Sequence, residues 1–478
     1  MTHSLRTLPL LLSACILLNA CTADRIELGS SAHSQMIELD RQNVLDQDAS
    51  EQISLSYAEA LKRAIAHNLD ARVSALEMLS KEDDIDIARL EAIPNLNITS
   101  TRYGRSNAGA SSSRSIVTGR ESLEPSFSTE RYHDTSEISV NWNILNFMLA
   151  VANSRIAKDE TLIAQQRHEK VLQNIERDVH AAYWRAYAYQ RTTQETKALI
   201  AEADQQLRNI TKADQNSFIS ASKAASLKQG ILQQLQALKA LDAELTYADI
   251  ELKSLLSIPQ KTKIILTSKP NDQDQLARSL LQSDIEALEK EALYNRPEVK
   301  ETVLQKNIDA QNTRNTILRT MPGAELFFAS NRDSNQFLYD QDWLSFSASL
   351  SQSLSALFTL PARHRAAKNI ETLGEARRLS LIAAIMAQVH LAQRRLDITM
   401  EDYKDAKRSS RVAAENARKA ETERKQGLSS GNNSLPIILQ AQQEKIKALQ
   451  MHAEMQDALS SLLNTLGRPL HRATEAGS

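Results

Sequence analysis

The chain has 478 residues, enough for two or three ordinary domains, but only 11 glycines and 10 prolines, and aromatic residues make up 4% of it. This scarcity of turn-forming residues argues against a loop-rich or β-rich fold and favours long, lightly interrupted helices. The formal net charge of −2 gives no indication of nucleic acid or an anionic surface as a partner.

The first 20 residues resemble a bacterial lipoprotein signal peptide. Arg6 supplies the positive charge, and residues 8–18 form an apolar core too short to span a bilayer. A lipobox-like sequence follows and ends in Cys21, where the rule for such proteins is cleavage before an acylated cysteine. We therefore expect a lipidated Cys21 at the mature N-terminus; the alternative is an ordinary signal peptide with a chance cysteine. An aspartate directly after the acylated cysteine favours retention of a lipoprotein at the inner membrane. Thr22 occupies that position here, so we expect the protein to lie in the outer membrane.

Two very long helices are expected after a tether or equatorial segment at residues 21–52. Residues 126–229 and 375–426 contain neither glycine nor proline. Helices over about 146–211 and 361–426 would each be roughly 100 Å long at ~1.5 Å per residue. Pro361 suits the first position of the second helix, and Gly427 suits its end.

The sequence also repeats itself, which indicates a duplicated fold. Glu59-Ala60-Leu61 with Asn68 recurs as Glu286-Ala287-Leu288 with Asn295, and Leu255-Leu256 recurs as Leu462-Leu463. We expect a first repeat at 53–259, a linker at 260–284, a second repeat at 285–467 and a tail at 468–478.

Two strands are predicted in each repeat, at about 95–103 and 137–145, and at about 323–330 and 343–353. Beyond residue 20 no apolar run is long enough for a membrane-spanning helix, so a membrane crossing would have to use strands. Strict alternation of apolar residues with Ser or Asn is typical of transmembrane barrel strands, although half-buried strands of a soluble sheet are the alternative. Ser139, Asn141 and Asn143 would then face a lumen. The residues expected to face lipid are Ile138, Val140, Trp142, Ile144, Leu344, Phe346 and Leu350.

The order of these parts resembles the TolC-like outer membrane factors, or outer membrane efflux proteins, over roughly residues 53–467. Residues 56–61 with 68–69, 88–94 and 295–299 carry the resemblance. It implies a mainly α fold with a small β part. Three duplicated TolC-like protomers would form a homotrimer with a 12-stranded transmembrane β-barrel on a long periplasmic α-helical barrel. It also implies an equatorial belt that includes 260–284, and docking on a periplasmic adaptor (membrane fusion) protein and an inner-membrane pump.

The helix tips and one acidic pair are further candidate sites. Family members often carry a glycine-containing turn followed by an aspartate. The second tip of this chain has the glycine but lacks the aspartate. The first tip has Asn216 at the position where the glycine is expected. Ordinary helix turns are the alternative for these residues. Near the tip of the second long helix, Asp402 and Asp405 lie one turn apart and could form a pore constriction, or be exposed surface acids. The candidate docking residues are Asn216, Ser217, Gly427, Leu428 and Ser429.

No pattern in the sequence indicates an enzyme, a metal site or a cofactor. The ten histidines never fall at metal-ligand spacing, and neither a phosphate loop nor a nucleophile elbow is present. The leading hypothesis is a passive outer-membrane duct for efflux or type I export, lipid-anchored and extending into the periplasm. The alternative is a structural periplasmic coiled-coil lipoprotein without a channel. The sequence does not separate drug, metal and protein as cargo.

Overall fold

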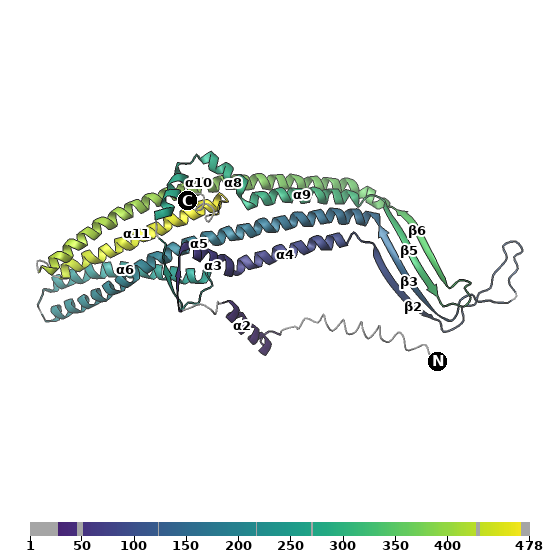
Figure 1. The fold of residues 1–478 in the computed structure, drawn as a ribbon, viewed down its shortest axis with the longest axis horizontal. Helices are drawn as coiled ribbons and strands as arrows, with labels where there is room; N and C mark the ends of the chain where they lie inside the picture. Colours follow the sequence, from purple (N-terminus) through teal and green to yellow (C-terminus); the bar gives the residue numbers. More distant parts are fainter. Residues whose placement is uncertain are drawn as a thin grey trace.

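The structure is a computed structural model that describes residues 27–44, 51–122, 124–216, 218–268, 271–426 and 431–469. The expected signal peptide, Cys21 and residues 470–478 lie outside these ranges. The described chain forms an elongated, curved bundle of helices with a β-sheet at one end and two helical hairpins at the other (Figure 1). Within those ranges, no helix is both long and apolar enough to cross a membrane.

The elements occur in two copies that have the same order. In chain order, the helices of the two copies contain 11, 22, 72 and 35 residues in both cases. This agreement of lengths reflects the internal repeat, and the mainly α fold with a small β part is confirmed. The first copy comprises α3 (Tyr57–His67), α4 (Leu69–Leu90), β2 (Asn95–Gly104), β3 (Tyr132–Asn143), α5 (Ile144–Gln215) and α6 (Ala221–Leu255); the second comprises α8 (Ile285–Asn295), α9 (Pro297–Leu318), β5 (Gly323–Asp333), β6 (Asp342–Ser351), α10 (Leu354–Lys425) and α11 (Gly431–Thr465).

The long helices begin earlier than the sequence indicated. At ~1.5 Å per residue, the 72 residues of α5 and of α10 correspond to about 108 Å each. The prediction of Ile144 as a strand residue was wrong, because the Asn143 side chain accepts the Asn146 N–H and starts α5 at Ile144. The prediction of Pro361 as a first helical residue was also wrong: it lies inside α10, where its missing N–H removes one backbone hydrogen bond.

The sheet joins the strand pairs of both copies in the order β2-β3-β5-β6, with every neighbouring pair antiparallel. A second, two-stranded sheet was not anticipated: β1 (Gln52–Leu55) pairs in parallel with β4 (Lys263–Leu266). Four residues are too few to show a hydrophobic period, so only the tertiary structure reveals these strands. The segment expected as a linker thus holds β4 and also α7 (Asn271–Gln282), while α2 (Ser31–Val44) precedes both copies.

Local sequence explains where the short helices begin. Ser56 and Glu59 form a reciprocal capping box at the start of α3. Asn68 ends α3 and caps α4, accepting the backbone N–H groups of Asp70 and Ala71. The buried core lies between the helices at mid-length, where Tyr183 and Leu256 are fully buried.

Gly467 occupies a position that an alanine cannot fill without strain. Its φ is +68°, and a Cβ there would lie 2.9 Å from the backbone N of Arg296 and the backbone C of Asn295. We expect Gly467→Ala to destabilise the protein by about 2–4 kcal/mol, because a left-handed conformation and a backbone clash add together. Gly230→Ala is the matched control: nothing lies within 4 Å of its Cβ, and alanine favours a helix interior by roughly 0.5–1 kcal/mol. Melting temperatures should therefore move in opposite directions; equal shifts would contradict the packing described for Gly467.

Candidate functional site

The four-stranded sheet has two chemically different faces. Residues paired across antiparallel strands lie on the same face, and successive residues alternate between faces. The register therefore places the even-numbered residues of β2, β3, β5 and β6 on one face and the odd-numbered residues on the other. We call these the apolar face and the polar face. One row across the apolar face is Leu96, Val140, Phe328 and Phe346; the next row, on the polar face, is Asn97, Ser139, Ala329 and Ser345.

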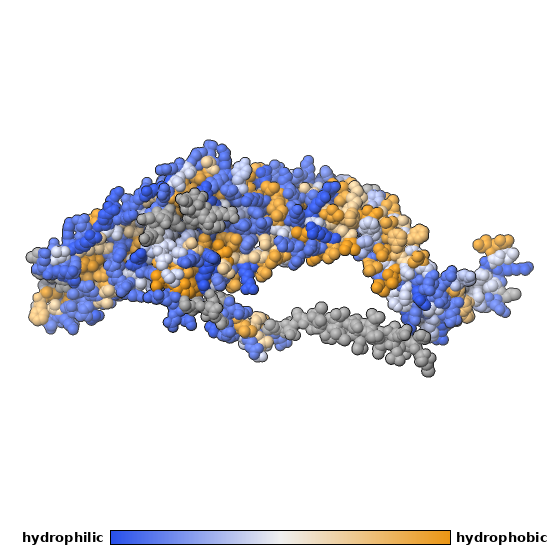
Figure 2. Space-filling view, in the orientation of Figure 1, coloured by the Kyte–Doolittle hydropathy of each residue, from blue (hydrophilic) through white to orange (hydrophobic). Residues whose placement is uncertain are grey.

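The apolar face is uncovered in the protomer. Leu344 and Phe346 are each 82% exposed, and Ile98 is 77% exposed. Figure 2 shows hydrophobic residues gathered where the sheet meets the helices, and hydrophilic residues toward its far end. At that far end Arg102 donates two hydrogen bonds to Asp134, at 2.7 and 2.8 Å. An apolar patch with a charged rim is typical of a surface that contacts a membrane or another protein.

Six of the seven residues expected to face lipid share this apolar face, and Ile144 does not because it belongs to α5. The six are Ile138, Val140, Trp142, Leu344, Phe346 and Leu350.

Hydrogen bonds order the polar face. The Asn141 amide donates to the carboxylate of Glu325 on the neighbouring strand, and the Asn331 amide donates to the Ser345 hydroxyl at 2.8 Å. Ser139 is 3% exposed. Within these four strands, all of which are described, the polar face carries no lysine or arginine.

The helical hairpins at the opposite end hold the other candidate residues. Asn216 ends α5, and its N–H donates to the carbonyl of Lys212. Phe218 follows the turn and is 79% exposed. Ser217, Gly427, Leu428 and Ser429 lie outside the described residues.

Asp402 and Asp405 are exposed on α10, which ends at Lys425 close to the expected residue 426. The 20 residues from 405 to 425 correspond to about 30 Å of helix. Asp405 lies 3.7 Å from Arg408 in an exposed ion pair.

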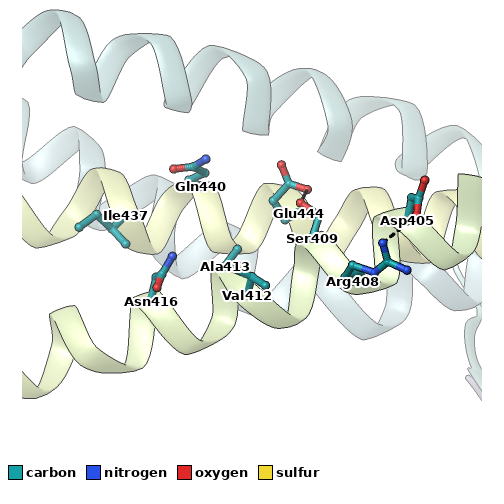
Figure 3. Close-up of a pocket in the computed structure, with 9 residues that line it drawn as sticks. All are labelled: Asp405, Arg408, Ser409, Val412, Ala413, Asn416, Ile437, Gln440 and Glu444. Atoms are coloured by element: carbon teal, nitrogen blue, oxygen red, sulfur yellow. Dashed lines mark hydrogen bonds and ion pairs between the residues drawn. The ribbon is translucent and has the colours of Figure 1, made fainter.

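Asp405 also lines an open groove of about 490 Å³ between α10 and α11 (Figure 3). In this groove the Ser409 hydroxyl donates to Glu444 at 2.8 Å. Arg408 lies toward the same end as Asp405, and Asn416 and Ile437 lie at the other. The lining is mixed polar and apolar, and no group of His, Cys, Asp and Glu among the described residues could hold a metal ion.

A buried polar cluster, which the sequence did not reveal, joins α5 to α11 and α7 at mid-length. The His180 Nε2–H donates to Gln456 at 3.1 Å, and the Gln456 amide donates to His452 at 3.3 Å and to Asp274 at 3.4 Å. Trp184 packs edge-on against His452. Burial of the imidazole, opposed in part by the hydrogen bond to Gln456 and reinforced by His452, lowers the pKa of His180 from 6.5 to about 4.

This cluster predicts a loss of stability in mild acid. Unfolded His180 binds a proton near pH 6.5, whereas the folded residue stays neutral until about pH 4. The contribution of neutral, buried His180 to the free energy of unfolding is therefore complete above pH 6.5. This contribution falls by roughly 3 kcal/mol as the pH drops to 4. His180→Gln should flatten the melting temperature over this range, whereas His364→Gln, on an exposed part of α10, should keep the wild-type slope. Parallel curves for wild type and His180→Gln would contradict the assignment of this pH dependence to His180.

No family model and no curated protein sequence matches this chain. Solved structures do match it. The MtrE outer membrane channel of Neisseria gonorrhoeae, in its open state, has a TM-score of 0.62 at 15% identity, covering 87% of this chain and 89% of that chain. The CmeC outer membrane channel of Campylobacter jejuni has a TM-score of 0.62 at 12% identity, covering 86% and 85%. CusC, whose structures are described in terms of transmembrane channel formation, has a TM-score of 0.63 at 13% identity, covering 86% of this chain and 92% of that chain. The chain therefore has the TolC-like outer membrane factor fold.

Proposed function

We propose that this protein is the outer-membrane channel component of a tripartite efflux or type I export system. Three protomers would form a passive duct from the periplasm to the exterior, without enzymatic activity. The observation that carries the proposal is the two-faced sheet at the end of helices about 108 Å long. Four strands from each of three protomers supply twelve, an even number as in bacterial outer-membrane barrels. Lipid would cover the apolar face, and the polar face would line the lumen.

The fold supports this assignment, because the structures that share it include outer membrane channels. A structural coiled-coil lipoprotein is the second candidate. In such a protein Leu344, Phe346 and Leu350 would remain exposed to water. Contiguous exposed apolar patches of this kind are unfavourable in a monomeric soluble protein. The sheet thus favours the duct.

The partners follow from the proposed assembly. We assign an adaptor protein to the helical tips, with Asn216, Ser217, Gly427, Leu428 and Ser429 as contacts, and an inner-membrane pump beyond it. Asp402 and Asp405 remain candidates for a narrow part of the duct. No cofactor is required, because transport energy would come from the pump.

The assembly can be tested on protein from outer-membrane fractions. It should run as a heat-modifiable trimer in mild detergent and conduct ions across a planar bilayer. A periplasmic monomer without conductance would favour the scaffold instead. A deletion strain, screened for drug and metal susceptibility and for secreted proteins, would then identify the cargo.

Lipidation of Cys21 is a separate expectation with its own test. Labelled palmitate should enter the wild-type protein and not Cys21→Ala, because the thiol is the expected acylation site. Cys15→Ala is the control and should label normally, since that residue leaves with the signal peptide. Equal labelling of wild type and Cys21→Ala would contradict the assignment.

A further inference from the structure

Four helices continue the four strands of the sheet as one layer with two free edges. α4 leads into β2, α5 follows β3, α9 leads into β5 and α10 follows β6. In this layer α4 packs on α5, α5 packs on α9, and α9 packs on the half of α10 next to the sheet (Figure 1). α4 and α10 therefore lie at opposite edges of the layer, as β2 and β6 do in the sheet.

The uncovered sides of both edge helices carry exposed apolar residues. Residues three or four apart lie on the same side of a helix, and an apolar stripe at this spacing is typical of a helix that packs against a neighbour. The stripes consist of Leu69, Val73, Leu76, Ile87 and Leu90 on α4, and of Ile370 and Leu373 on α10. Within the protomer, no other helix covers them.

The contact between α5 and α9 provides a template for what covers these edges. The Asn315 side chain of α9 donates to Asn153 of α5 at 3.1 Å, and Arg167 of α5 donates to Glu301 of α9. The residue number rises along α5 as it falls along α9, so the two helices are antiparallel. By the internal repeat, α10 is the equivalent of α5, and α4 is the equivalent of α9.

The repeat transfers the register of this contact to the edge helices. Equivalent helices have equal lengths, so each residue of α4 or α10 corresponds to one residue of α9 or α5. The transferred register places Arg363 of α10 opposite Ile87 of α4, and Arg377 of α10 opposite Val73 of α4. Both arginines are exposed. Neither has an ion-pair partner in the part of the chain that the structure describes.

Carboxylates lie one helical turn from both of these positions on α4. Asp70 and Glu77 flank Val73, and Asp83 precedes Ile87 by four residues. Such neighbours on one helix are about 5–6 Å apart, a distance that an arginine side chain can span. The three carboxylates are exposed and, like the two arginines, have no ion-pair partner among the described residues. The two edges are therefore complementary in charge at both levels.

A lipid surface does not account for the two arginines. α10 begins at Leu354, where it leaves the sheet, and Arg363 and Arg377 lie about 14 and 35 Å farther along the helix at ~1.5 Å per residue. The polar headgroup region adds only about 5–8 Å to each side of the hydrocarbon core. With the sheet spanning the membrane as proposed, both arginines lie beyond the reach of lipid headgroups.

We infer that α10 of one protomer docks antiparallel on α4 of the next copy, in a register held by ion pairs of Arg363 and Arg377. The inference rests on the proposed trimer and assigns the surfaces and the ion pairs through which its protomers meet. Arg363 pairs with Asp83, and Arg377 pairs with Asp70 and Glu77. The two surfaces differ, so the contact is heterologous, and a head-to-tail contact of this kind can close a ring.

The register is tested by oxidative cross-linking of cysteine pairs in outer-membrane fractions. Ser80 and Ile370 lie opposite each other in the transferred register, midway between the two arginine levels. Ser80→Cys with Ile370→Cys should give covalently linked dimers and trimers, because α4 and α10 of the same chain lie at opposite edges of the layer. The matched control is Ser80→Cys with Ser380→Cys, which is about 15 Å out of register and should give little linked product.

Charge reversal tests the ion pairs themselves. Arg363→Glu with Arg377→Glu should lower the amount of heat-modifiable trimer several-fold, and adding Asp70→Arg and Asp83→Arg should restore most of it. The control, Arg365→Glu with Lys368→Glu, changes charge by the same amount. The repeat equivalents of these two positions, Arg155 and Lys158, stay exposed although α5 packs on both α4 and α9. The control should therefore keep the wild-type amount of trimer.

The outcomes separate this inference from the proposed function. A conducting wild-type trimer in which the Ser80 and Ile370 pair links no better than the control pair would overturn the inference and leave the duct standing. In-register linkage without conductance would support the inference and overturn the duct. A product that joins this chain to a different protein would assign the edge to another partner and overturn the inference. Equal loss of trimer in both charge-reversal variants would overturn the role of Arg363 and Arg377.

Discussion

Val140→Arg is expected to remove most of the assembled trimer from the outer membrane. Val140 lies in the row Leu96, Val140, Phe328 and Phe346 on the apolar face. Under the proposed function this row contacts lipid, where an arginine near the bilayer midplane costs roughly 2–4 kcal/mol, and a trimer carries three copies. Heat-modifiable trimer bands in outer-membrane fractions measure the effect directly.

Asn141→Arg is the matched control, since it places the same side chain one residue away on the polar face. There Glu325, which already bonds to Asn141, would pair with the guanidinium in a water-filled lumen. We expect a normal amount of trimer and, at most, altered conductance. Equal assembly of the two variants would mean that β3 does not separate lipid from water. That result would favour the alternative of a structural coiled-coil lipoprotein without a channel.

The architecture could be predicted because its signals are local and repeated. The long stretches without glycine or proline indicated α5 and α10, and the alternation from Ile138 onward indicated β3. The ends were less accurate. Ile144 continues the alternation in sequence, yet the Asn143 cap turns it into the first residue of a helix. Pro361 resembles a helix start, yet α10 already begins at Leu354.

The buried polar contacts could not be predicted, because their partners are far apart in the chain. His180 and Gln456 are 276 residues apart, so the sequence around either residue does not indicate the other as its partner. β1 and β4 are each four residues long and pair only through the tertiary fold. The register of β3 against β5, which assigns the residues of both strands to the apolar or the polar face, is likewise a property of the folded sheet and not of either strand alone.

A second buried network, centred on Arg296, joins four helices. The Arg296 guanidinium donates to Gln388 of α10 at 2.6 Å and to Glu298 of α9 at 2.9 Å. Glu298 also pairs with Lys170 of α5 at 3.1 Å, and Lys170 donates to Asn464 of α11 at 2.8 Å. Burial alone would raise the pKa of Glu298. Hydrogen bonds from Arg296 and from the backbone, together with the charge of Lys170, outweigh burial and lower it to about 2.

Arg296→Met should therefore destabilise the protein by about 3–5 kcal/mol, because it leaves Gln388 and Glu298 without their buried partner. Adding Glu298→Gln should recover part of the loss, since the carboxylate that Arg296 neutralised is then gone. Arg185→Met is the matched control: its ion pair with Glu251 joins α5 to α6 at 3.0 Å but is nearly half exposed on both sides. Such pairs contribute only about 0–1 kcal/mol, so its melting temperature should stay close to wild type. If Arg296→Met melts like Arg185→Met, the network does not hold these four helices together.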